Sequence, residues 1–117
     1  MVIDMGANFE EIWSSPFVVP YLLKTGDYTV LSSDYFIACD TTGAAQTITL
    51  PTAVGITGRR YTIMRITGGV NAVVVDGNGA ETINTAANKT LATLYAALSV
   101  ISDGANWQMY NSQGTVT

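Results

Sequence analysis

Apolar and polar residues alternate in short runs along most of the chain, a pattern typical of β-strands that bury one face. The clearest run spans residues 46–50, where Ile48 and Leu50 fall on one face and threonines on the other. Glycine, asparagine and aspartate separate the runs at intervals of 8–12 residues. The pattern predicts eight or nine strands, at 28–31, 35–40, 46–50, 59–67, 71–76, 81–84, 89–92, 94–101 and 106–110.

Residues 59–67 form the longest of these runs. Tyr61, Ile63 and Arg65 fall on one face, and Met64 lies on the other between Thr62 and Ile66. Residues 94–101 also fit a helix, but β-branched residues near the end of that run favour a strand. The sequence therefore predicts an all-β fold, a small antiparallel β-sandwich or barrel-like domain over residues 27–117.

Two further patterns refine this fold. Residues 102–106 have the composition of a hairpin turn, in which Gly104 can adopt a positive φ. Trp107 then follows at alternating spacing with Met109, which favours a place for it in the core.

Residues 1–26 differ from the rest and are predicted to form an N-terminal arm. Asn8 is a candidate cap for a short helical turn, and an extended apolar segment broken by prolines follows at residues 17–23. Two interpretations stay open: an edge strand folded on its own core, or an arm that packs on a neighbouring subunit or partner. The candidate interface residues are Phe9, Ile12, Trp13, Phe17, Val18, Val19, Tyr21 and Leu22.

Composition narrows the function. Hydrophobic residues make up 48% of the 117 and charged residues only 12%, about half of the roughly 25% in an ordinary domain. With no histidine and a single cysteine, the chain lacks the residues of a Ser-His-Asp or Cys-His site and of most zinc sites. Five basic residues against nine acidic ones argue against nucleic-acid and anionic-membrane partners. We expect a non-enzymatic protein without cofactor or metal.

The remaining candidates for chemistry have structural interpretations that we favour. Asp76 and Glu81 flank a Gly-Asn-Gly segment that could supply oxygen ligands to calcium, but a hairpin turn explains it better. Cys39 sits in a β-run and is expected to be a small buried side chain rather than a nucleophile. The start of the chain lacks the basic region of a signal peptide, so we expect synthesis in the cytoplasm.

An ordered set of motifs covers about two-thirds of the chain, from Tyr28 to about Tyr110. The motifs are Tyr28-Thr29-Val30, Asp40-Thr41-Thr42-Gly43, Thr47-Ile48-Thr49-Leu50-Pro51, Gly58-Arg59-Arg60-Tyr61-Thr62-Ile63, Val73-Val74-Val75-Asp76, Glu81-Thr82-Ile83-Asn84 and Ser102-Asp103-Gly104-Ala105-Asn106-Trp107. This set resembles a β-rich module of tailed-bacteriophage structural proteins, found in tail fibres and spikes and in small capsid decoration (cement) proteins.

The resemblance implies a homotrimeric, non-enzymatic virion protein, and it transfers no catalytic residue. Because the chain is short and has no shaft repeat or coiled coil, we expect a capsid decoration protein that trimerises and binds the major capsid protein or another virion protein. The alternative is a tail fibre or spike domain that binds a host-surface glycan or receptor.

Overall fold

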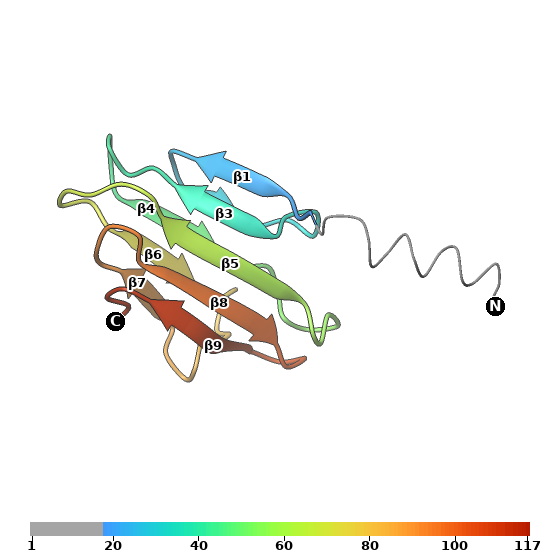
Figure 1. Ribbon diagram of the computed structural model, residues 1–117. Coiled ribbons are helices and arrows are strands. Elements are labelled where there is room, and N and C mark those ends of the chain that lie inside the picture. Colours follow the sequence, from blue (N-terminus) through green and yellow to red (C-terminus); the bar gives the residue numbers. More distant parts are fainter. Residues whose placement is uncertain (1–17) are drawn as a thin grey trace.

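Nine strands make up the framework of residues 18–117, the part of the chain that the computed structural model describes (Figure 1). They are β1 (Tyr21–Lys24), β2 (Tyr28–Thr29), β3 (Phe36–Cys39), β4 (Gln46–Thr49), β5 (Arg60–Arg65), β6 (Val73–Asp76), β7 (Asn88–Leu91), β8 (Ala97–Ser102) and β9 (Trp107–Gln113). These residues contain no helix, so the predicted all-β class is confirmed. The choice of strand over helix for residues 94–101 is also correct, but β8 begins only at Ala97, after a turn at residues 94–95.

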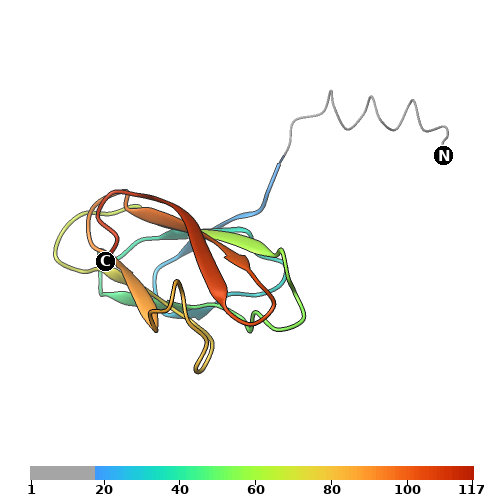
Figure 2. The same cartoon turned by 90° about the horizontal axis from the view of Figure 1, so that it is seen from below.

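The strands form two sheets that face each other in a sandwich-like arrangement (Figure 2). The five-stranded sheet has the order β1-β3-β5-β8-β9, and the four-stranded sheet has the order β2-β4-β6-β7. From β1 to β6 the chain crosses from one sheet to the other after every strand.

This alternation corrects the prediction of an antiparallel sandwich. The pairs β1–β3, β3–β5, β2–β4 and β4–β6 are all parallel, and only β5–β8, β6–β7 and β8–β9 are antiparallel. From β1 to β6, strands that follow one another in the sequence lie in opposite sheets, so the next strand in the same sheet runs in the original direction again. Both sheets are therefore mixed.

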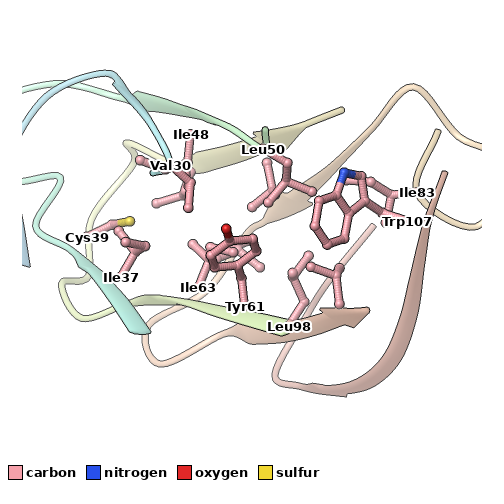
Figure 3. Packing of buried hydrophobic residues seen from close by; sticks show 14 of the residues in the cluster. Val30, Ile37, Cys39, Ile48, Leu50, Tyr61, Ile63, Ile83, Leu98 and Trp107 are labelled. Carbon is pink, nitrogen blue, oxygen red and sulfur yellow. The ribbon is translucent and has the colours of Figure 1, made fainter. Parts of the chain in front are cut away.

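The core lies between the sheets and is built from the inward-facing residues of both (Figure 3). Ile48 and Leu50 are fully buried, as their alternation with threonine predicts. Trp107 is also fully buried, which confirms its predicted place; its ring lies 5.6 Å from that of Tyr61, and its Nε1 donates to the carbonyl of Pro51. The aromatic pair links β9 to β5, and the hydrogen bond from Trp107 links both to Pro51, which follows β4 of the four-stranded sheet.

Two charged residues, Arg65 and Asp34, are buried within residues 18–117, and Arg65 is the more deeply buried of the two. Arg65, at the end of β5, is 1% exposed and donates hydrogen bonds to the carbonyls of Thr67 (2.8 Å) and Gly69 (2.7 Å), with a longer one to Leu91 (3.5 Å). These bonds tie the β5–β6 crossover to β5 and β7. The alternation in residues 59–67 places Arg65 on the same face as Tyr61 and Ile63, and the structure buries all three side chains.

In two turns the backbone conformation depends on particular residues. At 102–106 the hairpin is as predicted: Gly104 has φ +97°, and Asp103 Oδ1 accepts the N–H groups of Ala105 and Asn106. The strand predicted at 81–84 is wrong. Asn84 has a positive φ, and Ile83 exchanges two backbone hydrogen bonds with Ala86, so this segment is a tight turn within the β6–β7 connection.

Candidate interaction surface

Strand β1 forms one edge of the five-stranded sheet. Within residues 18–117 it pairs on one side only, with β3, in parallel register from Tyr21–Phe36 to Lys24–Cys39. Leu22 packs against the core, while Tyr21 and Leu23 point away from it and are 64% and 51% exposed. An exposed edge with apolar side chains offers unpaired backbone groups to another chain.

Only some of the predicted interface residues lie within residues 18–117, the part of the chain that the structure describes. Phe9, Ile12, Trp13 and Phe17, like the helical turn predicted after Asn8, lie outside the described residues. Val18 is 81% exposed and Val19 is half-buried.

Tyr21 and Leu22 belong to β1, and the carbonyl of Pro20 already accepts the N–H of Phe36. For residues 21–24, therefore, the interpretation as an edge strand on their own domain is correct. For the residues before them the choice stays open.

Two rows of side chains cross the outer surface of the five-stranded sheet, one apolar and one that also contains hydroxyl groups. Cross-strand register aligns Leu23, Ala38, Met64 and Ala97 in one row and Tyr21, Phe36, Thr62 and Ser99 in the next. Tyr21 and Phe36 stack with their ring centroids 5.3 Å apart. A shallow hollow of about 150 Å³ lies among residues of β3, β5, β8 and β9, including Phe36, Met64 and Asn111. We call the outward-pointing side chains Tyr21, Leu23, Phe36, Ala38, Met64 and Ala97 the apolar face, of which Ala38 and Ala97 are themselves buried among their neighbours.

The outer surface of the four-stranded sheet carries mainly threonine hydroxyl groups instead. Val74 lies at its middle between Thr47 and Thr90, and the next row holds Thr29, Thr49 and Asp76. We call this surface, with its four threonines, the threonine face. The two sheets thus present opposite chemistry to the outside.

The two sheets also differ in where their carboxylates lie. None of the five strands that carry the apolar face contains aspartate or glutamate, and Arg60 and Lys24 are their charged residues besides the buried Arg65. The six carboxylates of residues 18–117 lie in loops or in β6: Asp27, Asp34, Asp40, Asp76, Glu81 and Asp103.

Several of these carboxylates hold loops in place. Glu81 Oε1 accepts the N–H of Ala53 at 2.8 Å, so its carboxylate is already engaged with the neighbouring loop. Hydrogen bonds from Asn106 and Gln108 hold the pKa of Asp103 below its usual value, and hydrogen bonds from Thr42 do the same for Asp40. No group of three or more acidic or cysteine side chains within residues 18–117 is placed to hold a metal ion.

Cys39 is fully buried at the end of β3, in the position predicted for a small core side chain. Burial raises the pKa of its thiol to about 12, which keeps it protonated at neutral pH. Because the thiolate is the nucleophilic form, the buried thiol is unreactive in the folded protein.

Comparison of the chain with protein-family models and with curated proteins gives no match. Across residues 18–117, no helix is long and apolar enough to cross a membrane. The functional argument therefore rests on the surface just described.

Sequence reasoning missed most of this surface. It singled out Tyr21 but not Leu23, Phe36 or Met64, because alternation in one strand does not say which strands lie beside it. A signal was nevertheless present: residues 59–67 carry apolar side chains on both faces, whereas residues 46–50 carry them on one. A strand that is apolar on both faces indicates a sheet that is covered on both sides.

Proposed function

We propose that this chain is a non-enzymatic structural protein of a tailed-bacteriophage virion, of the capsid decoration (cement) type. It acts as a homotrimer and binds the major capsid protein or another virion protein through its N-terminal arm. The motif set from Tyr28 to Tyr110 supports the class, and the surface of the domain supports a role in assembly.

The observation that carries the proposal is the exposed edge of β1 together with the apolar residues that lead into it. Tyr21 and Leu23 are exposed on β1, which pairs on one side only within residues 18–117, and Val18, just before this strand, is exposed as well. Such an edge adds a strand from a neighbour through backbone hydrogen bonds, while alternate side chains provide specificity. The sequence before Val18 holds four further large apolar residues, Phe9, Ile12, Trp13 and Phe17.

The function of such contacts is thermodynamic. Apolar surface buried in an interface contributes roughly 25 cal/mol per Å². A few hundred Å² at each site therefore contributes several kcal/mol before the entropic cost of association is subtracted. Repeated over many sites, this stabilises a shell without any chemical step.

The test is made on particles that carry the protein. Imaging locates the chain and counts its copies, which we expect in threes on the capsid surface. A variant that lacks residues 1–17 keeps β1 intact, and we expect it to bind shells weakly and to leave them more sensitive to heat. The matched control replaces residues 1–17 with a Gly/Ser segment of equal length, which should behave like the deletion.

Two outcomes would contradict the proposal. Normal shell binding by both altered proteins would show that the arm is not the anchor. Location at the tail, together with binding of the purified protein to a host-surface glycan, would support the tail fibre or spike alternative instead.

A further inference from the structure

The connection after β6 begins with a tight turn at residues 78–81. The N–H of Glu81 donates a hydrogen bond of 2.9 Å to the carbonyl of Asn78, and Gly79 between them has φ +57°. This left-handed conformation suits glycine, which has no Cβ to obstruct it. The turn thereby places an Asn-Gly pair at the surface, with Gly79 exposed and Asn78 half-buried.

An asparagine followed by glycine is chemically labile. Asparagine is a thermolabile residue, because the backbone nitrogen of the next residue attacks its side-chain carbonyl carbon and closes a succinimide ring. A side chain on that next residue obstructs the attack, and glycine has none. Of the six asparagines in residues 18–117, only Asn78 precedes a glycine.

The turn leaves both reacting groups accessible. The hydrogen bond that closes it joins the N–H of Glu81 to the backbone carbonyl of Asn78, so it uses neither the N–H of Gly79 nor the Asn78 side chain. A Cβ on Gly79 would meet nothing within 4 Å, so the space around this residue is open. Water and base therefore reach the Gly79 nitrogen.

Other asparagines of the domain are held by hydrogen bonds. Asn84 donates through Nδ2 to the carbonyl of Met109 and accepts the N–H of the same residue through Oδ1. Asn106 accepts the N–H of Thr82 through its Oδ1. Such a side chain must break its hydrogen bonds before it turns towards the next backbone nitrogen, and this cost slows ring closure.

We propose that Asn78 is a site of spontaneous deamidation in the folded protein. The Gly79 nitrogen gives its proton to a base and forms a bond to Cγ of Asn78. The Cγ–Nδ2 bond breaks, and the amide nitrogen takes up a proton and leaves as ammonia. Water then opens the succinimide ring at either carbonyl and gives aspartate or isoaspartate. Water is the only reactant added, and nothing is oxidised or reduced.

Both products change the turn. Each adds one negative charge to the chain's net charge of −4, in a segment that already holds Asp76 and Glu81. Isoaspartate also adds a carbon atom to the backbone before Gly79. The turn has little room for it, because a Cβ on the adjacent Gly77 would already overlap the carbonyl oxygen of Glu81.

Glu81 connects this turn to the loop that follows β4. Its Oε1 accepts the N–H of Ala53 at 2.8 Å, and its Oε2 accepts the hydroxyl of Thr52 at 2.5 Å. A longer backbone at residue 78 shifts Glu81 and weakens these contacts. Isoaspartate should therefore destabilise the domain, whereas aspartate, which keeps the backbone length, should not.

The test incubates the purified full-length protein in mildly alkaline buffer at physiological temperature. Anion-exchange chromatography separates the more acidic products, and mass spectrometry of the tryptic peptide between Arg65 and Lys89 locates the converted residue. This peptide contains both Asn78 and Asn84, so Asn84 is the internal control. An isoaspartate methyltransferase assay distinguishes isoaspartate from aspartate.

Three variants complete the design. Gly79→Ala adds a methyl group that obstructs the attack, and Asn78→Gln requires a larger ring that closes more slowly. Asn78→Asp reproduces the aspartate product with the backbone length unchanged. Circular dichroism confirms that each variant is folded and gives its melting temperature.

We expect Asn78 to be converted about tenfold faster than Asn84, and Gly79→Ala to slow the conversion by about tenfold. Asn78→Gln should yield almost none of the acidic form. The isoaspartate product should melt at a lower temperature than Asn78→Asp, which should melt like the unaltered protein.

Conversion of Asn78 no faster than that of Asn84 would overturn the proposed site, as would an unchanged rate in Gly79→Ala or normal yields of the acidic form from Asn78→Gln. Equal melting temperatures for the isoaspartate product and Asn78→Asp would overturn the effect on Glu81 and its loop. These outcomes do not depend on the proposed virion function.

Discussion

The hydroxyl of Tyr28 donates a hydrogen bond of 2.6 Å to Oδ2 of Asp34, which also accepts the N–H of Leu31 at 2.8 Å. The carboxylate thereby closes the loop between β2 and β3, the first crossover that returns the chain to the five-stranded sheet. This hydrogen bond, followed by burial, raises the pKa of Tyr28 to about 12, because ionisation would place two negative charges side by side.

We expect this contact to make the fold sensitive to alkali. A tyrosine whose pKa is raised in the folded state contributes stability below its unfolded value of about 10, and this contribution is lost as the pH rises towards 12. Tyr28→Phe should lower stability at pH 7 and flatten the loss between pH 10 and 12. Urea unfolding at several pH values measures both effects; parallel curves for the two proteins would contradict the assignment.

Arg65 should be sensitive to substitution although its side chain lies in the core and not on a proposed interaction surface. Arg65→Met keeps much of the volume but leaves the carbonyls of Thr67 and Gly69 without their donor. A hydrogen bond to a charged group contributes about 1.5–3 kcal/mol. Because Thr67 is half-buried and Gly69 is exposed, water replaces part of this bonding, and we expect a loss of about 1–3 kcal/mol in unfolding free energy. Arg60→Met, at an exposed site on the same strand, is the control and should change stability by less than about 0.5 kcal/mol.

Two glycines with positive φ allow backbone strain and steric clash to be measured separately. A Cβ on Gly104 would lie 2.6 Å from Oγ1 of Thr57, whereas a Cβ on Gly79 would meet nothing within 4 Å. Gly79→Ala should therefore cost only the left-handed backbone penalty, about 1 kcal/mol. Gly104→Ala adds the clash, and we expect about 2–3 kcal/mol. Equal losses in thermal unfolding would show that Thr57 moves aside freely.

Tyr95 has φ +64°, an unfavourable conformation for a bulky residue. Its N–H donates to the carbonyl of Arg65, and its own carbonyl accepts a hydrogen bond from Gln113, so backbone contacts hold it there. Asparagine tolerates this region better. Because the Tyr95 side chain is 56% exposed, Tyr95→Asn should raise the unfolding free energy by about 0.5–1 kcal/mol. A lower melting temperature would mean that the exposed ring stabilises the domain.

Local features of the fold could be predicted from the sequence, but which strands pair with one another could not. The alternation of Gln46–Thr49 and the Asp103–Gly104 turn depend on neighbours in the chain, and both were predicted correctly. The parallel pairing and the turn at Asn84 depend on contacts across the sandwich, such as the Nδ2 of Asn84 donating to the carbonyl of Met109.

The candidate surface shows the same division. The exposure of Tyr21 follows from an apolar segment with prolines, which sequence can show. The row that joins Leu23 to Met64 exists only because β1, β3 and β5 lie side by side, and no local pattern specifies that arrangement.

The alternation of strands between sheets also has a consequence for folding speed. From β1 to β6 no strand pairs with its neighbour in sequence, so this part of the domain cannot form by successive closure of hairpins. Its contact order is correspondingly high, and the entropy of closing each loop is lost before the pairing that compensates it. We expect refolding on the millisecond-to-second scale, in which the local hairpin β8–β9 forms early and the β1 edge joins late.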